Sequence, residues 1–224
     1  MSITIDAGVT ISAGITIDPV GPAPVPSATG GTITSLTVGS TNYRVHTFSV
    51  GTSTFALDLT RTVEYLVVGG GGGGGTGIHA PDHYGWPGYG GAVSTGTVTL
   101  AGGDYSVSVG SGGSGGVNNP LNPPGNRYFG NTGTSSTFYT VVSPGGLGGQ
   151  AVVASNGTNP PDNSVASSIT GTSVTYGTPG AVTVSSVVGT SYSYPAGHGG
   201  DGGGLGNFSG GAGAPGIVVI RYTV

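Results

Sequence analysis

Glycine runs dominate this sequence and limit the folds available to it. Glycine makes up 50 of the 224 residues, with runs or near-runs at 69–75, 110–116, 145–149, 197–204 and 209–213. Ordering one glycine costs about 0.5–1 kcal/mol more than ordering alanine, so ordering all of them costs on the order of 25–50 kcal/mol, several times the stability of a domain. The runs are therefore either disordered or located where neighbouring main chains leave no room for a Cβ atom.

Close packing of the glycine runs is the interpretation that the composition favours. Disordered chains combine low hydrophobicity with high net charge, whereas this chain has 35% hydrophobic residues and a net charge of −4. In collagen, extended three-fold helices pack so closely that only glycine fits between them. Polyglycine-II-like helices can pack in the same way and hydrogen-bond to their neighbours, which satisfies their buried amides. We expect such packed helices here, with flexible glycine linkers as the alternative.

The remaining segments predict an all-β protein with essentially no α-helix. Only the stretches 40–50 and 52–68 exceed ten residues without glycine or proline, and both are rich in the threonine, valine and aromatic residues that favour strands. Segments 93–100 and 104–109 predict a hairpin, and Glu64 and Arg221 are expected to pair across a sheet. The expected strands are 32–38, 43–50, 54–59, 63–68, 93–100, 104–109, 137–142, 173–176, 181–188 and 216–224.

Three regions follow from the sequence: an N-terminal segment 1–18, a proline-rich spacer 19–27 and a glycine-rich β/polyglycine domain 28–224. The first region holds three hexapeptides, a period typical of parallel β-helices. One such coil cannot bury its own apolar edge, so we expect it to add strands to a sister copy or to another protein. A strand that caps the main domain is the alternative, and a trimer is the expected oligomer. The branched residues expected to dock are Ile3, Ile5, Val9, Ile11, Ile15 and Ile17.

The charged residues exclude several partners. Lysine is absent and only four arginines are present, whereas a nucleic acid requires one cation for each phosphate that is neutralised. No run of 18 apolar residues occurs, so no membrane insertion is expected. Cysteine is absent, which excludes disulfides and thiolate metal sites.

Two short motifs resemble enzyme signatures but lack their context. The strand and glycine run at 63–75 match a dinucleotide fingerprint, which requires a following helix. Pro81 and Pro87 prevent that helix. The pattern at 112–116 matches a nucleophile elbow, but again no helix can follow it. We therefore expect neither an enzyme nor a cofactor.

Histidine and aspartate residues occur close together in two places and suggest candidate metal sites. His79, Asp82 and His83 lie within five residues, and His198 lies close to Asp201. Imidazole and carboxylate groups could hold a divalent metal. Solvated loop residues are the simpler interpretation, and no metal site is predicted.

The segment 78–89 is the strongest candidate for a recognition surface. It combines His79, Asp82, His83, Tyr84, Trp86 and Tyr89, and large aromatic side chains next to polar groups are typical of binding surfaces. Packing of Trp86 and Tyr89 over the glycine helices is the alternative. Three further excursions, 117–129, 150–168 and 189–196, are expected at the same end of the domain. Their candidate contact residues are Arg127, Tyr128, Phe129, Tyr192 and Tyr194.

Three blocks of sequence resemble a known family. They are VEYLVVGGGGGGG at 63–75, a hairpin-like block at 90–116 and GGAGAPGIVVIRY at 210–222. Together they resemble the glycine-rich domain of bacteriophage virion proteins, over roughly residues 43–224. A more distant similarity is to the tail-fibre tip adhesins of T-even-like phages, in which packed polyglycine helices carry receptor-binding loops.

The resemblance implies a function on the virion surface. The expected protein is a structural protein of tail-fibre or adhesin type. Its N-terminus would dock on another virion protein, and its loops would contact a host receptor that is a protein or a glycan. A capsid decoration or cement protein with a mechanical role is the alternative.

Overall fold

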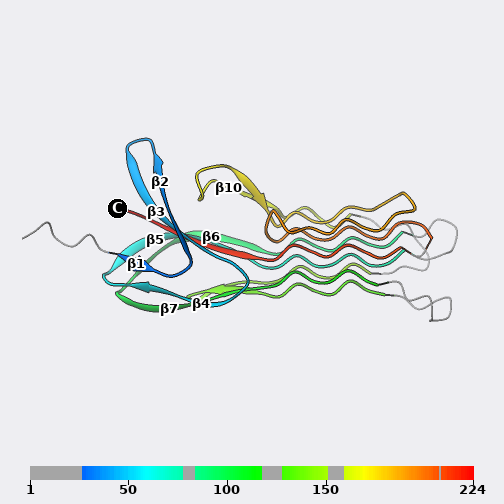
Figure 1. The fold of residues 1–224 in the computed structure, drawn as a ribbon, viewed down its shortest axis with the longest axis horizontal. Helices are drawn as coiled ribbons and strands as arrows, with labels where there is room; N and C mark the ends of the chain where they lie inside the picture. The colour runs from blue at the N-terminus through cyan, green and yellow to red at the C-terminus, as the bar shows by residue number, and fades with distance from the viewer. Residues whose placement is uncertain (1–26, 78–83, 118–127, 151–158, 207) are drawn as a thin grey trace, which may run out of the picture.

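The computed structural model describes residues 27–77, 84–117, 128–150, 159–206 and 208–224. Antiparallel sheets occupy one end of the molecule, and extended glycine-rich segments run side by side away from them (Figure 1). Throughout the described residues the regular elements are strands and no helix occurs. The expectation of an all-β protein is therefore confirmed.

A five-stranded antiparallel sheet carries the C-terminal strand at its centre. Its order is β2-β3-β12-β5-β6, so the last strand lies between two strands from the first third of the chain. Residue Arg221 lies directly opposite Glu64 in the register. The strands are β2 (Thr32–Val38), β3 (Thr41–Phe48), β12 (Ile217–Thr223), β5 (Arg61–Val68) and β6 (Val93–Leu100).

A second five-stranded sheet has the order β1-β4-β7-β8-β9, and β10 and β11 form a separate hairpin. Neighbouring strands in both sheets are antiparallel. These strands are β1 (Ala28–Thr29), β4 (Gly51–Leu57), β7 (Gly103–Val109), β8 (Ser136–Phe138), β9 (Val141–Ser143), β10 (Val165–Ser167) and β11 (Val174–Tyr176).

The alternation of side chains along β12 places residues in two hydrophobic cores. Val218 and Ile220 pack in a core that includes Phe55 and Phe138 of the second sheet. Val219 points to the other face and packs in a core with residues of the β10–β11 region, including Ile169. Successive side chains of a strand point to opposite faces, so β12 is buried on both of its faces.

Several predicted strands are confirmed and others need correction. Segments 32–38 and 93–100 are strands with the predicted bounds. The single strand predicted at 137–142 is two strands, because the chain turns at Tyr139, which has a φ of 54°. Segment 181–188 is not a strand; the N–H of Ala181 donates instead to a side chain, that of Asp201.

The predicted hairpin between 93–100 and 104–109 is also wrong. Strand β6 pairs with β5, whereas β7 pairs with β4 and β8 of the other sheet. The short link at Ala101 and Gly102 therefore carries the chain from one sheet to the other. A local turn signal cannot distinguish these two paths, because both need a short glycine-containing connection.

His46 lies in the first core and gives the fold a dependence on acid. Its ring is fully buried, its Nδ1 lies 2.8 Å from the carbonyl oxygen of Gly30, and it stacks on Tyr222 with 5.7 Å between ring centroids. Burial lowers the pKa of His46 below its ordinary value of 6.5; the Gly30 hydrogen bond opposes this shift and the Arg44 charge adds to it.

We therefore expect stability to fall as the pH drops below 6.5, because the unfolded chain then binds a proton that folded His46 resists. Above that pH the contribution of His46 is fully present. Thermal midpoints measured between neutral and mildly acidic pH test this prediction. His46→Gln should show a flatter pH profile, and an equally steep profile in that variant would contradict the assignment.

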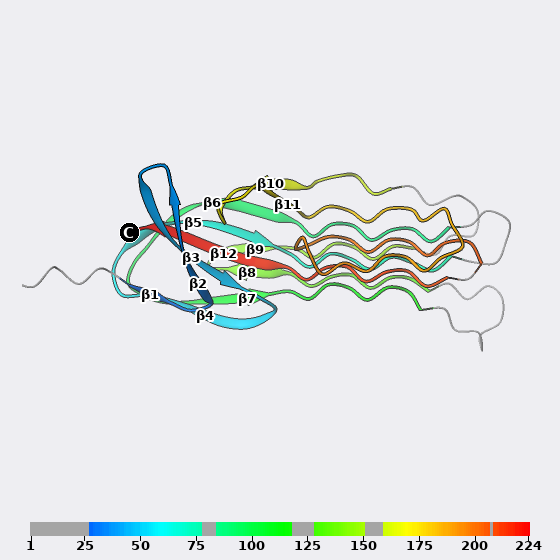
Figure 2. The same ribbon diagram turned by 45° about the horizontal axis from the view of Figure 1, so that its top comes forward.

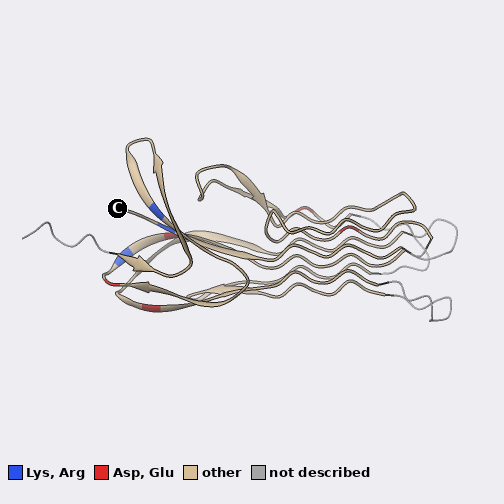
Figure 3. Cartoon of the chain, viewed as in Figure 1, with Lys and Arg blue, Asp and Glu red and all other residues tan. Residues whose placement is uncertain are grey.

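The glycine-rich segments form an array of parallel and antiparallel neighbours beside the sheets (Figures 1 and 2). We call the end where they join the strands the sheet end, and the opposite end the far end. Asp201 is the single charged residue in these segments, and most other charged residues of the described chain lie near the sheets (Figure 3). The segments, named here glycine segments, are 69–77, 85–92, 110–117, 128–135, 144–150, 177–182, 187–192, 197–204 and 208–216.

Hydrogen bonds around segment 69–77 repeat every three residues. Its successive amides donate in turn to three antiparallel neighbours, 86–92, 128–134 and 208–214, at distances of 2.8–3.0 Å. Its carbonyl groups accept from three further neighbours that run parallel to it. The parallel donors are Gly113, Gly116, Gly146, Gly149, Gly200 and Gly203. The segment thus has six hydrogen-bonded neighbours, and each of its described amides has a main-chain acceptor.

The same segment has no room for side chains at its glycines. A Cβ atom on Gly70 would overlap the carbonyl group of Ser111, one on Gly71 that of His198, and one on Gly72 that of Leu147. At each glycine from 69 to 75 the nearest atom would lie less than 3.0 Å away and belongs to a backbone. The predicted close approach of main chains is confirmed here, and disorder is excluded for the described segments.

Candidate functional site

The far end of the array is the first candidate site. Thr76 donates its N–H to the carbonyl of Tyr128 at 3.0 Å, and Gly85 donates to Gly203 at 2.8 Å. These bonds hold Tyr128 and Tyr84, both half-buried, at the far end. The described segments that lead into 78–83, 118–127 and 151–158 all finish there (Figures 1 and 2).

Trp86 and Tyr89 lie within a glycine segment rather than in a loop. Their N–H groups donate to the carbonyls of Gln150 and Leu147, both at 2.9 Å. Both side chains are half-buried, and the indole Nε1 of Trp86 is buried without a hydrogen-bond partner. The two are three positions apart and both donate to segment 144–150, so they occupy equivalent positions on one side of the array. Their contact with a receptor remains a prediction.

Exposed apolar side chains at the far end were not all identified from the sequence. Phe129 is 55% exposed, as its place among the candidates suggested, but Val117 at 66% and Val187 at 48% were missed. Val187 lies in the segment that was predicted to be a strand, and its carbonyl accepts the N–H of Gly204. A valine in a run of valine and serine resembles a strand residue, so no local signal marks it as an exposed position.

Several predicted contact residues lie outside the described residues, and the structure does not test them. They are His79, Asp82, His83 and Arg127, together with the docking residues Ile3, Ile5, Val9, Ile11, Ile15 and Ile17.

Tyr192 belongs to a half-buried cluster that the sequence did not predict. Its ring stacks on His198 with 3.7 Å between centroids and 18° between planes. Its hydroxyl donates to the carboxylate of Asp201 at 3.3 Å, and Asp201 also accepts the N–H of Ala181 at 2.8 Å. Burial raises the pKa of Tyr192, and the Asp201 charge raises it further. The cluster joins segments 177–182, 187–192 and 197–204 through side chains.

The excursion at 189–196 turns at the sheet end, which corrects the expectation that it shares the far end. Ala196 packs in the core with Val68, and Gly197 donates its N–H to Pro215 at 2.8 Å. Tyr194 is 61% exposed near this turn. Tyr194 is therefore at the opposite end of the array from Tyr84 and Tyr128, whereas Tyr192 lies within the array, where its N–H donates to the carbonyl of Ala212 at 3.0 Å.

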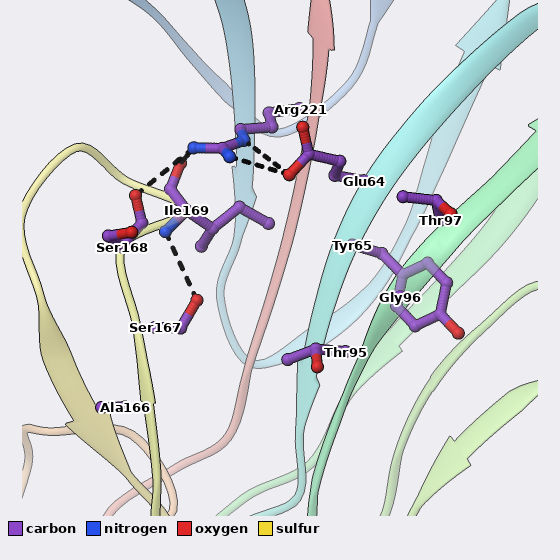
Figure 4. Close-up of a pocket in the computed structure, with 10 residues that line it drawn as sticks. All are labelled: Glu64, Tyr65, Thr95, Gly96, Thr97, Ala166, Ser167, Ser168, Ile169 and Arg221. Atoms are coloured by element: carbon purple, nitrogen blue, oxygen red, sulfur yellow. Dashed lines mark hydrogen bonds and ion pairs between the residues drawn. The ribbon is translucent and has the colours of Figure 1, made fainter. Parts of the chain in front are cut away.

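A polar pocket of about 380 Å³ is the second candidate site (Figure 4). It lies between strands β5 and β6 and the chain at 166–169. Its centre is the predicted pair: Arg221 Nη2 lies 2.7 Å from Glu64 Oε2, which confirms the pairing across the sheet.

Arg221 links strands β12 and β5 to the connection between β10 and β11. Its Nε also donates to Glu64, at 3.1 Å, and its Nη1 donates to the carbonyls of Ser168 and Ile169 at 3.3 and 3.2 Å. Its guanidinium lies 4.7 Å from the ring centroid of Tyr43. Because every nitrogen already donates, the arginine holds the structure together and offers little to an anionic ligand.

The described residues hold no group of three or more histidine, aspartate or glutamate side chains arranged for a metal ion. Nor do they include a helix of the length and hydrophobicity needed to cross a bilayer.

These features define the chain as an all-β protein with a hydrogen-bonded array of glycine segments. The sequence model of a glycine-rich domain matches residues 47–194. The chain therefore belongs to the glycine-rich domain family. No curated protein matches the sequence.

Proposed function

We propose that the glycine segments are polyglycine-II-type helices. The supporting observation is the three-residue repeat of hydrogen bonds along 69–77, since a polyproline-II-type helix has three residues per turn and no internal hydrogen bonds. Such helices direct successive amides to different neighbours. The array would then be a stiff body, because its main-chain polar groups are bonded between segments rather than within them.

We propose that the protein is a structural component of a bacteriophage virion surface, of tail-fibre or adhesin type, and not an enzyme. The observation that carries this proposal is the gathering of segment ends at the far end of the array (Figure 2). A stiff support that holds variable connections away from the rest of the molecule is suited to recognition. Membership of the glycine-rich family and the resemblance to phage proteins support the same reading.

In this proposal the connections at the far end contact a receptor on the host surface, either a protein or a glycan. Tyr84, Tyr128 and the exposed Phe129 are the described candidates. His79, Asp82, His83 and Arg127 fall in connections that leave the same end. Residues 1–18 hold the chain to its assembly, through a virion protein or a sister copy.

Adsorption to the host tests this proposal. Phage that carry a Gly/Ser replacement of 78–84 should adsorb at least about tenfold more slowly, because a few aromatic contacts dominate most binding energies. The replacement spares segment 85–92 and therefore the array. Tyr194→Ala, at the sheet end, is the matched control and should leave adsorption unchanged.

Unchanged adsorption by the folded 78–84 variant would contradict the receptor role. If particles that lack the protein were instead mechanically fragile, this result would indicate the role of a capsid decoration protein. Microscopy of labelled protein on the particle distinguishes the tail from the capsid.

A further inference from the structure

Strand β2 is a long sheet edge without the usual protection against pairing. It is the first strand of its sheet, and within the described chain it pairs with β3 alone. Six of its seven residues are exposed, and its sequence, TITSLTV, has no charged residue and no proline. The β2–β3 hairpin stands out from the rest of the molecule (Figure 1). Natural sheets usually protect such edges with charges, prolines or short strands.

The other sheet edges are short or partly covered. Strands β1 and β9 have two and three residues. Strand β6 is longer, but its Ser94 hydroxyl lies 2.9 Å from that of Ser143 in β9, so the second sheet lies against it. The long open edge of the described structure is therefore β2.

The N-terminal segment has the pattern of a strand with one apolar face. From residue 3 to residue 17 every odd position is apolar and every even position is polar or glycine. A strict period of two over this length predicts an extended strand of about 50 Å whose odd positions need cover. The odd positions are Ile3, Ile5, Ala7, Val9, Ile11, Ala13, Ile15 and Ile17; the even ones are Thr4, Asp6, Gly8, Thr10, Ser12, Gly14 and Thr16.

Over residues 35–38 the faces of β2 match this pattern. Leu36 lies opposite Tyr43, and Val38 lies on the same face of the hairpin. Leu36 packs against the core that contains Val45 and Ile169. A strand added beyond β2 would place its apolar row next to Leu36 and Val38 and would extend that core. Its threonines would lie beside Ser35 and Thr37, a kind of contact that this protein already uses between Thr62 and Thr99, whose hydroxyls are 2.7 Å apart.

We propose that the β2 edge of one copy, which has seven residues, pairs with a matching length of segment 3–17 of a second copy. The spacer favours a second copy over the same chain, because prolines at 19, 22, 24 and 26 predict an extended conformation about 25 Å long. The spacer precedes Ser27, whose N–H donates to Asp58 Oδ2 at 2.7 Å. From its sequence we expect the spacer to direct residues 3–17 away from β2 of the same chain.

The donor segment and the acceptor edge are different surfaces, so the contact is head-to-tail and can close into a ring. The trimer expected from the sequence is one such ring. This inference does not depend on host attachment, and its test is separate from the adsorption test.

Complementation between two full-length variants tests the proposal. The edge variant, Thr34→Lys with Val38→Lys, places charges at two exposed positions of β2. The tail variant, Ile5→Lys with Ile11→Lys, interrupts the apolar row of the N-terminal segment. Val142→Lys, at an exposed valine of β9, is the matched control for an added lysine. Masses are measured by sedimentation, and thermal midpoints verify that each variant folds.

The proposal predicts that wild-type protein and Val142→Lys associate and that each double variant alone sediments as a monomer. Mixing the two variants should then give a 1:1 dimer, near twice 21.4 kDa, because one chain offers an intact tail and the other an intact edge. Monomeric wild-type protein would overturn the proposal. So would an edge variant that still associates, which would indicate a tail-to-tail contact. A mixture that stays monomeric would overturn it as well.

Discussion

Gly72→Ala is expected to destabilise the protein by about 3–5 kcal/mol, since overpacking and two weakened hydrogen bonds combine. A methyl group there would overlap the carbonyl of Leu147. The N–H of Gly72 donates to Tyr89 at 2.9 Å and its carbonyl accepts from Gly200 at 2.8 Å, so the main chain cannot move away without stretching these bonds. Such a loss corresponds to a fall of roughly 10 °C in the thermal midpoint of a chain of this size.

Leu147→Ala is the matched control for this change. The Leu147 side chain is 60% exposed, although its carbonyl is the group that the Gly72 methyl would strike. Because the carbonyl is unaffected by truncation, the control should change stability by less than about 0.5 kcal/mol. Calorimetry of both variants provides the comparison. Equal midpoints for wild type and Gly72→Ala would contradict close packing at this position.

Asp201→Ala has the second largest expected effect. The carboxylate accepts the N–H of Ala181 at 2.8 Å and the hydroxyl of Tyr192 at 3.3 Å, and the residue is only 7% exposed. Truncation leaves a main-chain donor and a phenol without their acceptor. Ala181 is exposed and Tyr192 is half-buried, so water can partly replace the lost acceptor, and the two groups cost about 1–3 kcal/mol in total. Denaturant unfolding at neutral pH measures the loss.

Asp201→Asn separates the effect of the negative charge from that of the hydrogen bonds. The asparagine oxygen can still accept from Ala181, and its amide can donate to the Tyr192 oxygen, so the expected loss is about 1 kcal/mol. If both variants were as stable as the wild type, the cluster would not join the segments. A loss in Asn equal to that in Ala would show that the negative charge, and not the hydrogen bonds, stabilises the cluster.

The sequence was sufficient to predict features that depend on local pattern or composition. Segments 32–38 and 93–100 are strands with the predicted bounds, and both are rich in the threonine and valine residues that favour strands. The number of glycines predicted close main chains, because only packing can offset their conformational cost. The Glu64–Arg221 pair was predicted because two opposite charges on strands can pair across a sheet.

Features that depend on contacts between distant segments were not predicted. The path from β6 to β7 crosses between sheets, and the sequence of that link does not specify which partner each strand takes. Segment 181–188 has strand-like residues, but the carbonyls of Ala181 and Val187 accept the N–H groups of Gly202 and Gly204, so these residues bond to a glycine segment and not to a strand. Tyr192 resembled an exposed loop aromatic because nothing near it in sequence indicates the stacking on His198.

Amide hydrogen exchange along 69–77 tests most directly whether the glycine segments form a hydrogen-bonded array. The structure gives every amide in this segment a main-chain acceptor in a neighbouring segment at 2.8–3.0 Å. We predict that the amides of 70–75 exchange as slowly as those of the adjoining strand β5, because both open only when the fold opens. Exchange of these amides at the rate of an unstructured chain, while β5 remains protected, would contradict the account.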